Sequence, residues 1–338
     1  RPAAPKETQL RLIEALSGRG DPAAVSAVVA AYDQGDEEIR MAAMKALGVL
    51  GDASAVPLLL SAAVEAPLTV KRHAREVLAL LPGPDVNETL LQLAESADGA
   101  KRIEALRALG GRRAFDAKPL MMRMAAVPDN DTRTIALRAL RGIGDEEDLP
   151  VLLEQLNAAV EDEHRSEVER AVVAIAERIN PPDRRADVVL KALPETTNPA
   201  ARLALLRVLG GISNEASLAA LRDALKDSNP EVRRTVINGL AGWPNDAPKD
   251  DLLAVVKSPM APEDRAPAFE GYVRLLRGAT TPSADELAAR YVEIMKMAQN
   301  QGEKRLILSG IAELATAATL EMAQAARNDA EVAEEIEA

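Results

Sequence analysis

The chain has 338 residues, with 41 Lys and Arg against 53 Asp and Glu, which gives a net charge of −12. Apolar residues make up 47%, so the chain can bury a core and is not a disordered polyampholyte. Its few aromatic residues (Trp 1, Tyr 3, Phe 2) argue against a β-sandwich or barrel. The absence of cysteine excludes disulfides, thiolate metal sites and a cysteine nucleophile.

In chain order, one pattern returns with a period near 31 residues. An anchor residue, usually basic, is followed by small residues at positions +3 and +6 and an apolar residue at +7. The first clear copy is Arg40 with Ala43, Ala46 and Leu47. The ten anchors are Gln9, Arg40, Lys71, Arg102, Arg133, Arg165, Arg202, Arg233, Arg265 and Lys304. Such internal repetition predicts a stacked repeat protein.

Each copy predicts a helix, because positions 0, +3, +4 and +7 share one face of an α-helix. Four residues before the anchor, a residue suited to capping the helix marks its start, and Pro199 and Pro230 follow two of these caps. The basic anchor is expected to reach a cap of its own or of a neighbouring unit. The expected caps are Asp36, Asp98, Asp129, Glu161, Asn198, Asn229 and Asn300. Glycines expected to end these helices are Gly48, Gly51, Gly110, Gly111, Gly142, Gly144, Gly210, Gly211 and Gly242.

A second amphipathic helix is predicted in the rest of each unit. Pro57, Pro119 and Pro150 each lie 17 residues after an anchor, in the first turns of this helix. Small residues at +3 and +6 of the first helix let a neighbouring helix approach closely. One helix pair cannot bury its apolar faces alone, so neighbouring pairs must stack.

The segment from Asp36 to Gly48, followed by Gly51-Asp52-Ala53-Ser54-Ala55-Val56-Pro57-Leu58, resembles the bacterial HEAT repeat, including the subtype first noted in phycobilisome lyases. The resemblance covers essentially the whole chain. It implies an all-α fold, a right-handed α-α superhelix of about ten stacked helix pairs that forms a single solenoid over residues 1–338. In such arrays the first helix of each unit usually lines the concave surface. The resemblance implies little about function, because one fold serves many roles.

The period is interrupted at a few places. The units over 165–201 and 265–303 are longer, with the extra residues near 180–185 and 278–283. Insertions of this kind form loops on one face, sometimes the binding face, or simply lengthen helices. The last unit, over 329–338, reads as truncated, and the chain lacks an initiator Met, so we expect an excerpt of a longer, multidomain protein. Whether that parent protein is exported is left open by the sequence.

The search for chemistry predicts no catalytic residue, no cofactor and no metal site. His73 and His164 fall in different units and are interpreted as surface helix residues. The acidic run 145–148 is interpreted as a helix cap rather than a calcium loop. Trp243 occupies position +10, where other units carry Leu or Ile, and is predicted to fill the core. Phe115 is expected to fill the same place in the unit that has Arg112 there.

One surface pattern remains as a candidate partner-binding site. Position +5 points away from the core and is basic in five units, with Glu76 interrupting the series. Stacking of the units predicts a column of these side chains, suited to the carboxylates of a partner or to phosphate. The residues are Lys45, Arg107, Arg138, Arg170 and Arg207.

The sequence therefore favours a non-catalytic scaffold or spacer that binds another protein or peptide, with an acidic partner favoured. One alternative is a chromophore lyase or chaperone of the phycobilisome-lyase type, which rests on the resemblance alone. A second is a nucleic-acid-binding HEAT-like protein, which the net charge disfavours. No apolar run is long enough to span a membrane and no signal peptide is visible, so we expect a soluble chain whose compartment stays open.

Overall fold

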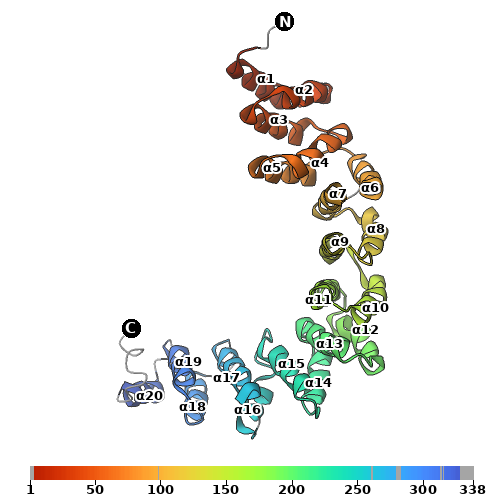
Figure 1. Ribbon diagram of the computed structural model, residues 1–338. Coiled ribbons are helices and arrows are strands. Elements are labelled where there is room, and N and C mark those ends of the chain that lie inside the picture. Colours follow the sequence, from red (N-terminus) through yellow and green to blue (C-terminus); the bar gives the residue numbers. More distant parts are fainter. Residues whose placement is uncertain are drawn as a thin grey trace. The chain divides into compact units, whose positions relative to one another are not determined.

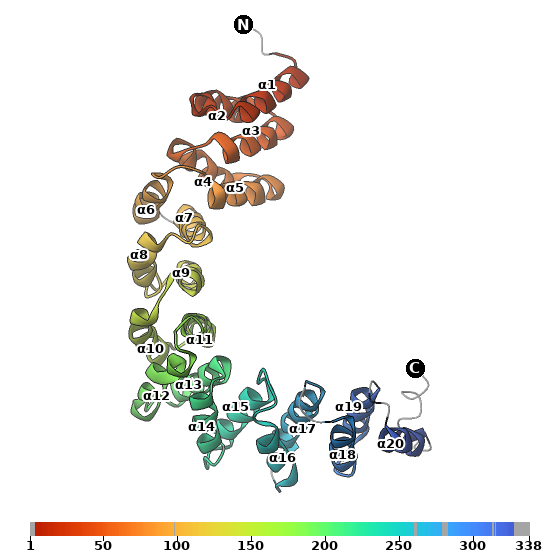
Figure 2. The ribbon, with the colours of Figure 1, turned by 180° about the vertical axis from the view of Figure 1, so that it is seen from behind.

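A computed structural model describes residues 4–97, 99–259, 262–278, 283–312, 314 and 316–327. In these ranges the chain is all-α, and twenty α-helices pack in ten pairs (Figures 1 and 2). The helices divide into two compact units, residues 1–175 and residues 176–338. The repeat predicted from the sequence is confirmed, because every one of the ten anchors lies in the first helix of a pair.

The first helices carry the anchors and stack directly on one another within each unit, α1 on α3, α5 on α7 and α7 on α9, and likewise α13 on α15 and α15 on α17. Both ribbon views show this layering in residues 1–175. The first helices are α1 Lys6–Arg19, α3 Glu37–Leu50, α5 Leu68–Leu80, α7 Gly99–Gly111, α9 Asn130–Ile143, α11 Asp162–Ala176, α13 Pro199–Ile212, α15 Pro230–Ala241, α17 Pro262–Arg277 and α19 Gln301–Ile311.

The second helices form the other layer. Several begin with a 3-10 turn, and the predicted prolines Pro57, Pro119 and Pro150 lie in the first turns of α4, α8 and α10. A proline is tolerated there because its missing N–H has no intrahelical partner. The second helices are α2 Val25–Gln34, α4 Val56–Glu65, α6 Val86–Ser96, α8 Lys118–Met124, α10 Leu149–Ala158, α12 Asp187–Ala192, α14 Glu215–Ala224, α16 Lys249–Lys257, α18 Ala284–Met295 and α20 Ala317–Arg327.

The core follows the repeat register. In α3, Ala43, Met44 and Leu47 are fully buried, as their positions +3, +4 and +7 predict. Trp243 is also buried, with 1% of its surface exposed, which confirms its interpretation as a core residue. The prediction for Phe115 is wrong: this side chain is 66% exposed. Arg112 instead reaches back to the carbonyl oxygens of Leu78 and Leu81, at 3.2 and 2.7 Å.

Most of the predicted helix starts are confirmed. The side chains of Asp36, Asp129, Asn198, Asn229 and Asn300 accept hydrogen bonds from main-chain N–H groups in the first turn. Asp98 lies outside the described residues. The acidic run at 145 caps a 3-10 turn: the Asp145 carboxylate accepts from Glu147 N, and the Asp148 carboxylate accepts from Asp145 N at 2.8 Å. This confirms the capping interpretation of residues 145–148.

The predicted helix ends need a correction. Gly51, Gly144 and Gly242 do follow the last residue of a helix, but Gly48, Gly110, Gly111, Gly142, Gly210 and Gly211 lie inside helices. At two of these six positions the reason is the stacking of adjacent first helices. A Cβ on Gly110 would lie 2.9 Å from Ala139 Cβ, and one on Gly210 would lie 3.1 Å from Gly239 Cα. Gly110 and Gly210 therefore allow adjacent helices to approach closely, and neither glycine ends a helix.

Three of the basic anchors, Arg40, Arg102 and Arg165, bind carbonyl groups at the end of the preceding second helix. Arg40 donates to Tyr32 O and Arg102 donates to Ala94 O, at 3.3 and 3.2 Å. Helices end with carbonyls that lack partners, and an arginine can supply the missing donors. Arg133 instead contacts the carboxylate of Glu161, the expected cap of the next unit, at 2.8 Å.

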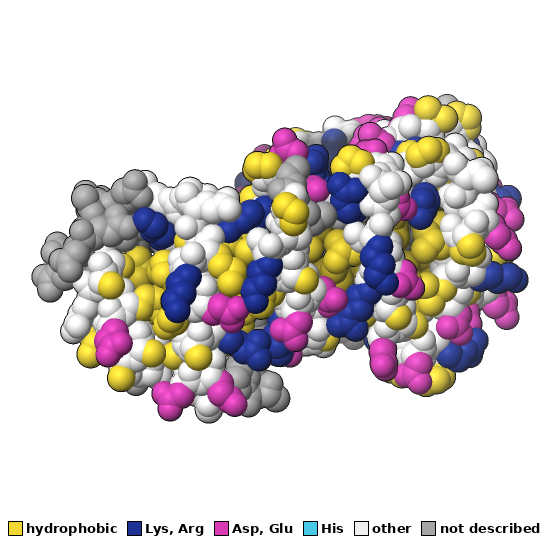
Figure 3. All heavy atoms as spheres, turned by 90° about the horizontal axis from the view of Figure 1, so that it is seen from below, with side chains coloured by type: hydrophobic (Ala, Val, Ile, Leu, Met, Phe, Trp, Pro, Cys, Tyr) yellow, Lys and Arg dark blue, Asp and Glu magenta, His cyan; other side chains and the backbone are white. Residues whose placement is uncertain are grey.

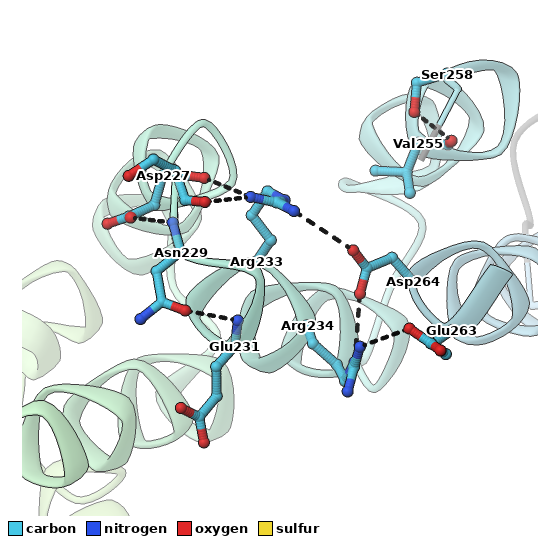
Figure 4. A network of polar contacts seen from close by, with 10 residues as sticks. Asp227, Asn229, Glu231, Arg233, Arg234, Val255, Ser258, Glu263 and Asp264 are labelled. Atoms are coloured by element: carbon cyan, nitrogen blue, oxygen red, sulfur yellow. Dashed lines mark hydrogen bonds and ion pairs between the residues drawn. The ribbon is translucent and has the colours of Figure 1, made fainter. Parts of the chain in front are cut away.

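Figure 4 shows one such anchor in the second unit. Arg233 donates to Asp227 O and Ser228 O, and its guanidinium lies 3.8 Å from the fully buried carboxylate of Asp264. The neighbouring Arg234 contacts Asp264 and Glu263 at 3.3 and 3.2 Å. A buried carboxylate thus joins α15 to α17, where the charge of Asp264 is balanced by arginines of the preceding pair.

The longer unit near 180–185 forms 3-10 turns, Pro182–Ala186 and Leu193–Glu195, around the short helix α12. The second insertion falls largely on residues 279–282, which lie outside the described residues, as does the predicted truncated frame over 329–338. None of the described helices is long and apolar enough to cross a membrane.

Candidate functional site

The predicted column of basic residues is exposed on the first-helix layer. Lys45, Arg107, Arg138, Arg170 and Arg207 all point to solvent, as position +5 predicts. Three of them, Arg107, Arg138 and Arg170, lie on the successive helices α7, α9 and α11 of the first unit. Lys45 lies on α3, beyond the helix that carries Glu76, and Arg207 belongs to the second unit. The candidate site therefore consists of the basic residues on α7, α9 and α11.

Two buried glutamates hold these arginines, and the sequence analysis missed both. Glu104 and Glu167 occupy position +2 and are 5% and 3% exposed. Glu167 accepts hydrogen bonds from Arg138 at 3.2 Å and Arg170 at 2.8 Å, and also from Arg141. Glu104 lies 3.4 Å from Arg107 and accepts two hydrogen bonds from Arg75.

A signal for these glutamates was present in the repeat register. Position +2 varies between units, from Ala42 and Ile135 to Arg11 and His73, but only these two of the ten units carry an acidic residue there. Arg75 departs as well, because it stands at position +4, where most units carry a buried apolar side chain. The two departures compensate each other across the α5–α7 contact. The Glu104 carboxylate raises the pKa of Arg75 through this hydrogen bonding.

The arginines outnumber the carboxylates that hold them. Five arginines contact the two buried carboxylates: Arg75 and Arg107 contact Glu104, and Arg138, Arg141 and Arg170 contact Glu167. Arg107, Arg138 and Arg170 keep 41%, 54% and 57% of their side-chain surface exposed. A guanidinium has five N–H donors, so each retains donors that face solvent. The glutamates therefore hold the arginines in place and leave some of their N–H donors available to a ligand.

A depression lies between α7 and α9, which we call the α7/α9 hollow. It has a volume of about 230 Å³. Arginines at its edge surround a floor of glycine, alanine and apolar side chains, and none of the lining residues is acidic. Its lining residues are Leu106, Arg107, Gly110, Gly111, Arg113, Ile135, Arg138, Ala139 and Gly142. The hollow can accept a small anionic group over a floor of exposed main chain.

Arg113 joins the edge of the hollow through an unusual main-chain conformation. Its φ is 51°, in the left-handed region that a residue with a Cβ adopts at a cost of about 1–2 kcal/mol. This conformation follows the end of α7, where Arg113 N donates to Gly110 O at 3.1 Å. The chain therefore turns sharply at a residue whose side chain lines the hollow.

The two histidines are half-buried helix residues rather than members of a site. His73 lies 3.2 Å from Glu76, and burial lowers the pKa of His164. Within the described ranges, no group of three or more His, Asp and Glu side chains is arranged to hold a metal ion. On the face drawn in Figure 3, basic and acidic side chains are interspersed, with apolar atoms between them.

Helix pairs of about 31 residues whose first helices stack on one another define an α-solenoid repeat protein. The protein-family model for HEAT repeats matches residues 1–79, 87–173 and 186–272 of the sequence. The chain therefore belongs to the HEAT-repeat family. The match is to HEAT repeats in general, and the lyase-like subtype stays a prediction. A comparison with curated proteins found no match.

Solved structures with a similar fold include those of Kap121p and of yeast importin-β. Kap121p bound to Ste12p matches with a TM-score of 0.53 and 13% identity, over 93% of this chain and 40% of that chain. Yeast importin-β, Kap95p, matches with a TM-score of 0.53 and 14% identity, over 93% of this chain and 48% of that chain. The chain thus spans less than half the length of either protein. At this level of identity the likeness concerns the fold alone.

Proposed function

We propose that the chain is a non-catalytic scaffold that binds a protein partner through an acidic segment, on the first-helix layer of residues 1–175. The observation that carries this proposal is the set of exposed arginines held by Glu104 and Glu167, on a chain whose net charge is −12. Fixed arginines lose little conformational entropy on binding and can form charge-assisted hydrogen bonds with carboxylates. The solved structures of Kap121p with Ste12p and with Nup53p offer a fold-level precedent for protein binding.

Nucleic acid is the weaker candidate. A polyanion requires a broad basic face that neutralises several phosphates. Here α11, which carries Arg170, also carries Asp162, Glu163 and Glu169. A short acidic peptide fits a few exposed arginines among acidic residues better than a nucleic-acid backbone does.

The test removes two arginines without exposing a buried carboxylate. Arg107→Ala leaves Glu104 paired with Arg75, and Arg170→Ala leaves Glu167 paired with Arg138 and Arg141. The matched control, Arg123→Ala with Lys226→Ala, removes the same charge from other exposed ion pairs. Charge reversal would be a poorer test, because a new carboxylate would stand beside Glu104 or Glu167.

The chain and both double variants are immobilised and exposed to an extract of the source organism. We expect a protein with an acidic segment to be retained by the wild type and the control and lost from Arg107→Ala/Arg170→Ala. Retention of the same proteins by all three would contradict the proposed site. Turnover of a small molecule by the chain would contradict its non-catalytic role.

A further inference from the structure

We infer that the α7/α9 hollow is the specific subsite for one carboxylate of an extended Asp- or Glu-containing peptide, which enters between Arg107 and Arg138 and lies over Gly142. This inference rests on the proposed function and adds the place and chemistry of recognition. Three arginines and no acidic residue line the hollow, so a carboxylate is the complementary group.

The floor of the hollow is open because of Gly142. A Cβ built on this residue meets no atom within 4 Å, in contrast to Gly110, where it would lie 2.9 Å from Ala139 Cβ. Gly110 therefore serves the packing of α7 on α9, whereas no packing contact requires a glycine at 142. Its missing side chain leaves room beside Arg138, one turn earlier on the same helix.

A side chain at position 142 would occupy this room. Helical side chains lean toward the N-terminus of their helix and cover the preceding turn. On α9 the preceding turn carries Arg138 and Ala139, both of which line the hollow. Gly142→Leu should therefore fill the hollow without touching the core, and Gly142→Ala should fill only a small part of it.

The chain offers a closely matched control. Gly18 is the second-to-last residue of α1, as Gly142 is of α9, and a Cβ on Gly18 also meets no atom within 4 Å. Gly18→Leu makes the same chemical change at the same place in a first helix, far from the hollow. Both substitutions replace glycine with a better helix former, so both proteins should remain folded.

The experiment measures fluorescence anisotropy of a labelled peptide in which Glu alternates with Ala, titrated with the purified chain. We expect Gly142→Leu to weaken binding at least about tenfold, equivalent to about 1.4 kcal/mol. Gly18→Leu should stay within about twofold of the wild type, Gly142→Ala should lose less affinity than Gly142→Leu, and a peptide with Gln in place of Glu should not bind. Thermal unfolding of each variant verifies that the fold is retained.

Two outcomes overturn the inference. The first is wild-type affinity in Gly142→Leu, and the second is an equal loss in Gly18→Leu. If Gly142→Leu binds normally while Arg107→Ala/Arg170→Ala does not, the hollow is wrong and the scaffold function stands. A single-stranded oligonucleotide that displaces the peptide and binds more tightly, with steep salt dependence, would assign the arginines to nucleic acid instead.

Discussion

Arg75 Nε in α5 lies 2.7 Å from a carboxylate oxygen of Glu104 in the neighbouring helix α7. Arg75 occupies position +4, where most repeats bury an apolar side chain, and Glu104 is 5% exposed. The pair therefore replaces an apolar contact between two stacked helices. A second contact, from Glu104 to Arg107, extends this pair to the surface of the proposed binding site.

Removing one member of this pair should destabilise the fold more than removing both. Arg75→Leu leaves the Glu104 carboxylate buried with only Arg107 near it, and we expect a loss of about 2–3 kcal/mol. The double variant Arg75→Leu/Glu104→Leu restores an apolar contact and should recover most of that loss. Urea unfolding of the wild type, both single variants and the double variant gives the coupling free energy. Additive effects would show that the two side chains do not interact.

Glu167 should be needed chiefly to neutralise the arginines around it. Glu167→Gln removes the negative charge that Arg138, Arg141 and Arg170 share, and the unfolding free energy should fall by about 1–2 kcal/mol. Because the arginines are partly exposed, added salt should screen their repulsion and reduce this loss. Unfolding measured at low and high salt checks the prediction. A loss that is independent of salt would point to packing rather than charge.

Stability should depend on pH through His164. Burial, followed by the nearby positive charge of Arg133, lowers the pKa of His164 below its ordinary value of 6.5. As pH falls below that value, the unfolded chain binds a proton that the folded chain does not, so the unfolding free energy decreases. Below the lowered pKa of the folded state, both states bind the proton, so His164 no longer changes the unfolding free energy with pH. His164→Gln should show a smaller decrease between about pH 7.5 and 5.5, measured as the urea midpoint. An identical pH profile in the two proteins would rule out His164 as the cause.

Two glycines in the first-helix layer should respond to alanine in opposite ways. A Cβ on Gly271 would lie 2.7 Å from Ala241 Cα, so α15 and α17 must move apart in Gly271→Ala, at a cost of about 2–3 kcal/mol. Gly142→Ala meets open space and should gain up to about 0.5 kcal/mol from helix propensity. Thermal unfolding of both variants separates the two cases. Similar shifts would contradict the close contact of α15 with α17.

Replacing Arg113 with glycine should raise the stability of the fold and weaken peptide binding. Its φ of 51° suits glycine better, so Arg113→Gly should raise the unfolding free energy by about 0.5 kcal/mol after the greater flexibility of the unfolded chain is counted. The same change removes one of three arginines from the α7/α9 hollow, and binding of the Glu-containing peptide should weaken about threefold. Calorimetry and peptide titration on one preparation measure both effects. Tighter peptide binding by Arg113→Gly would show that Arg113 is not part of the binding site.

The sequence by itself determined the repeat, the ten helix pairs and the core. Positions +3, +4 and +7 are fixed by the geometry of a single helix, so a periodic pattern identifies buried residues such as Met44 without knowledge of the neighbours. Trp243 at position +10 was placed correctly for the same reason. The exposed arginines at position +5 were likewise found from the register alone.

Only the tertiary structure decided what those arginines touch. Arg75 and Glu104, like Arg138 and Glu167, are 29 residues apart and meet because adjacent first helices stack with a particular offset. The glycines illustrate the same limit: a glycine near the end of a helix looks like a cap in the sequence, whereas Gly110 is a contact point for Ala139. Distances between helices depend on every side chain in the contact, and a pattern along one helix does not contain them.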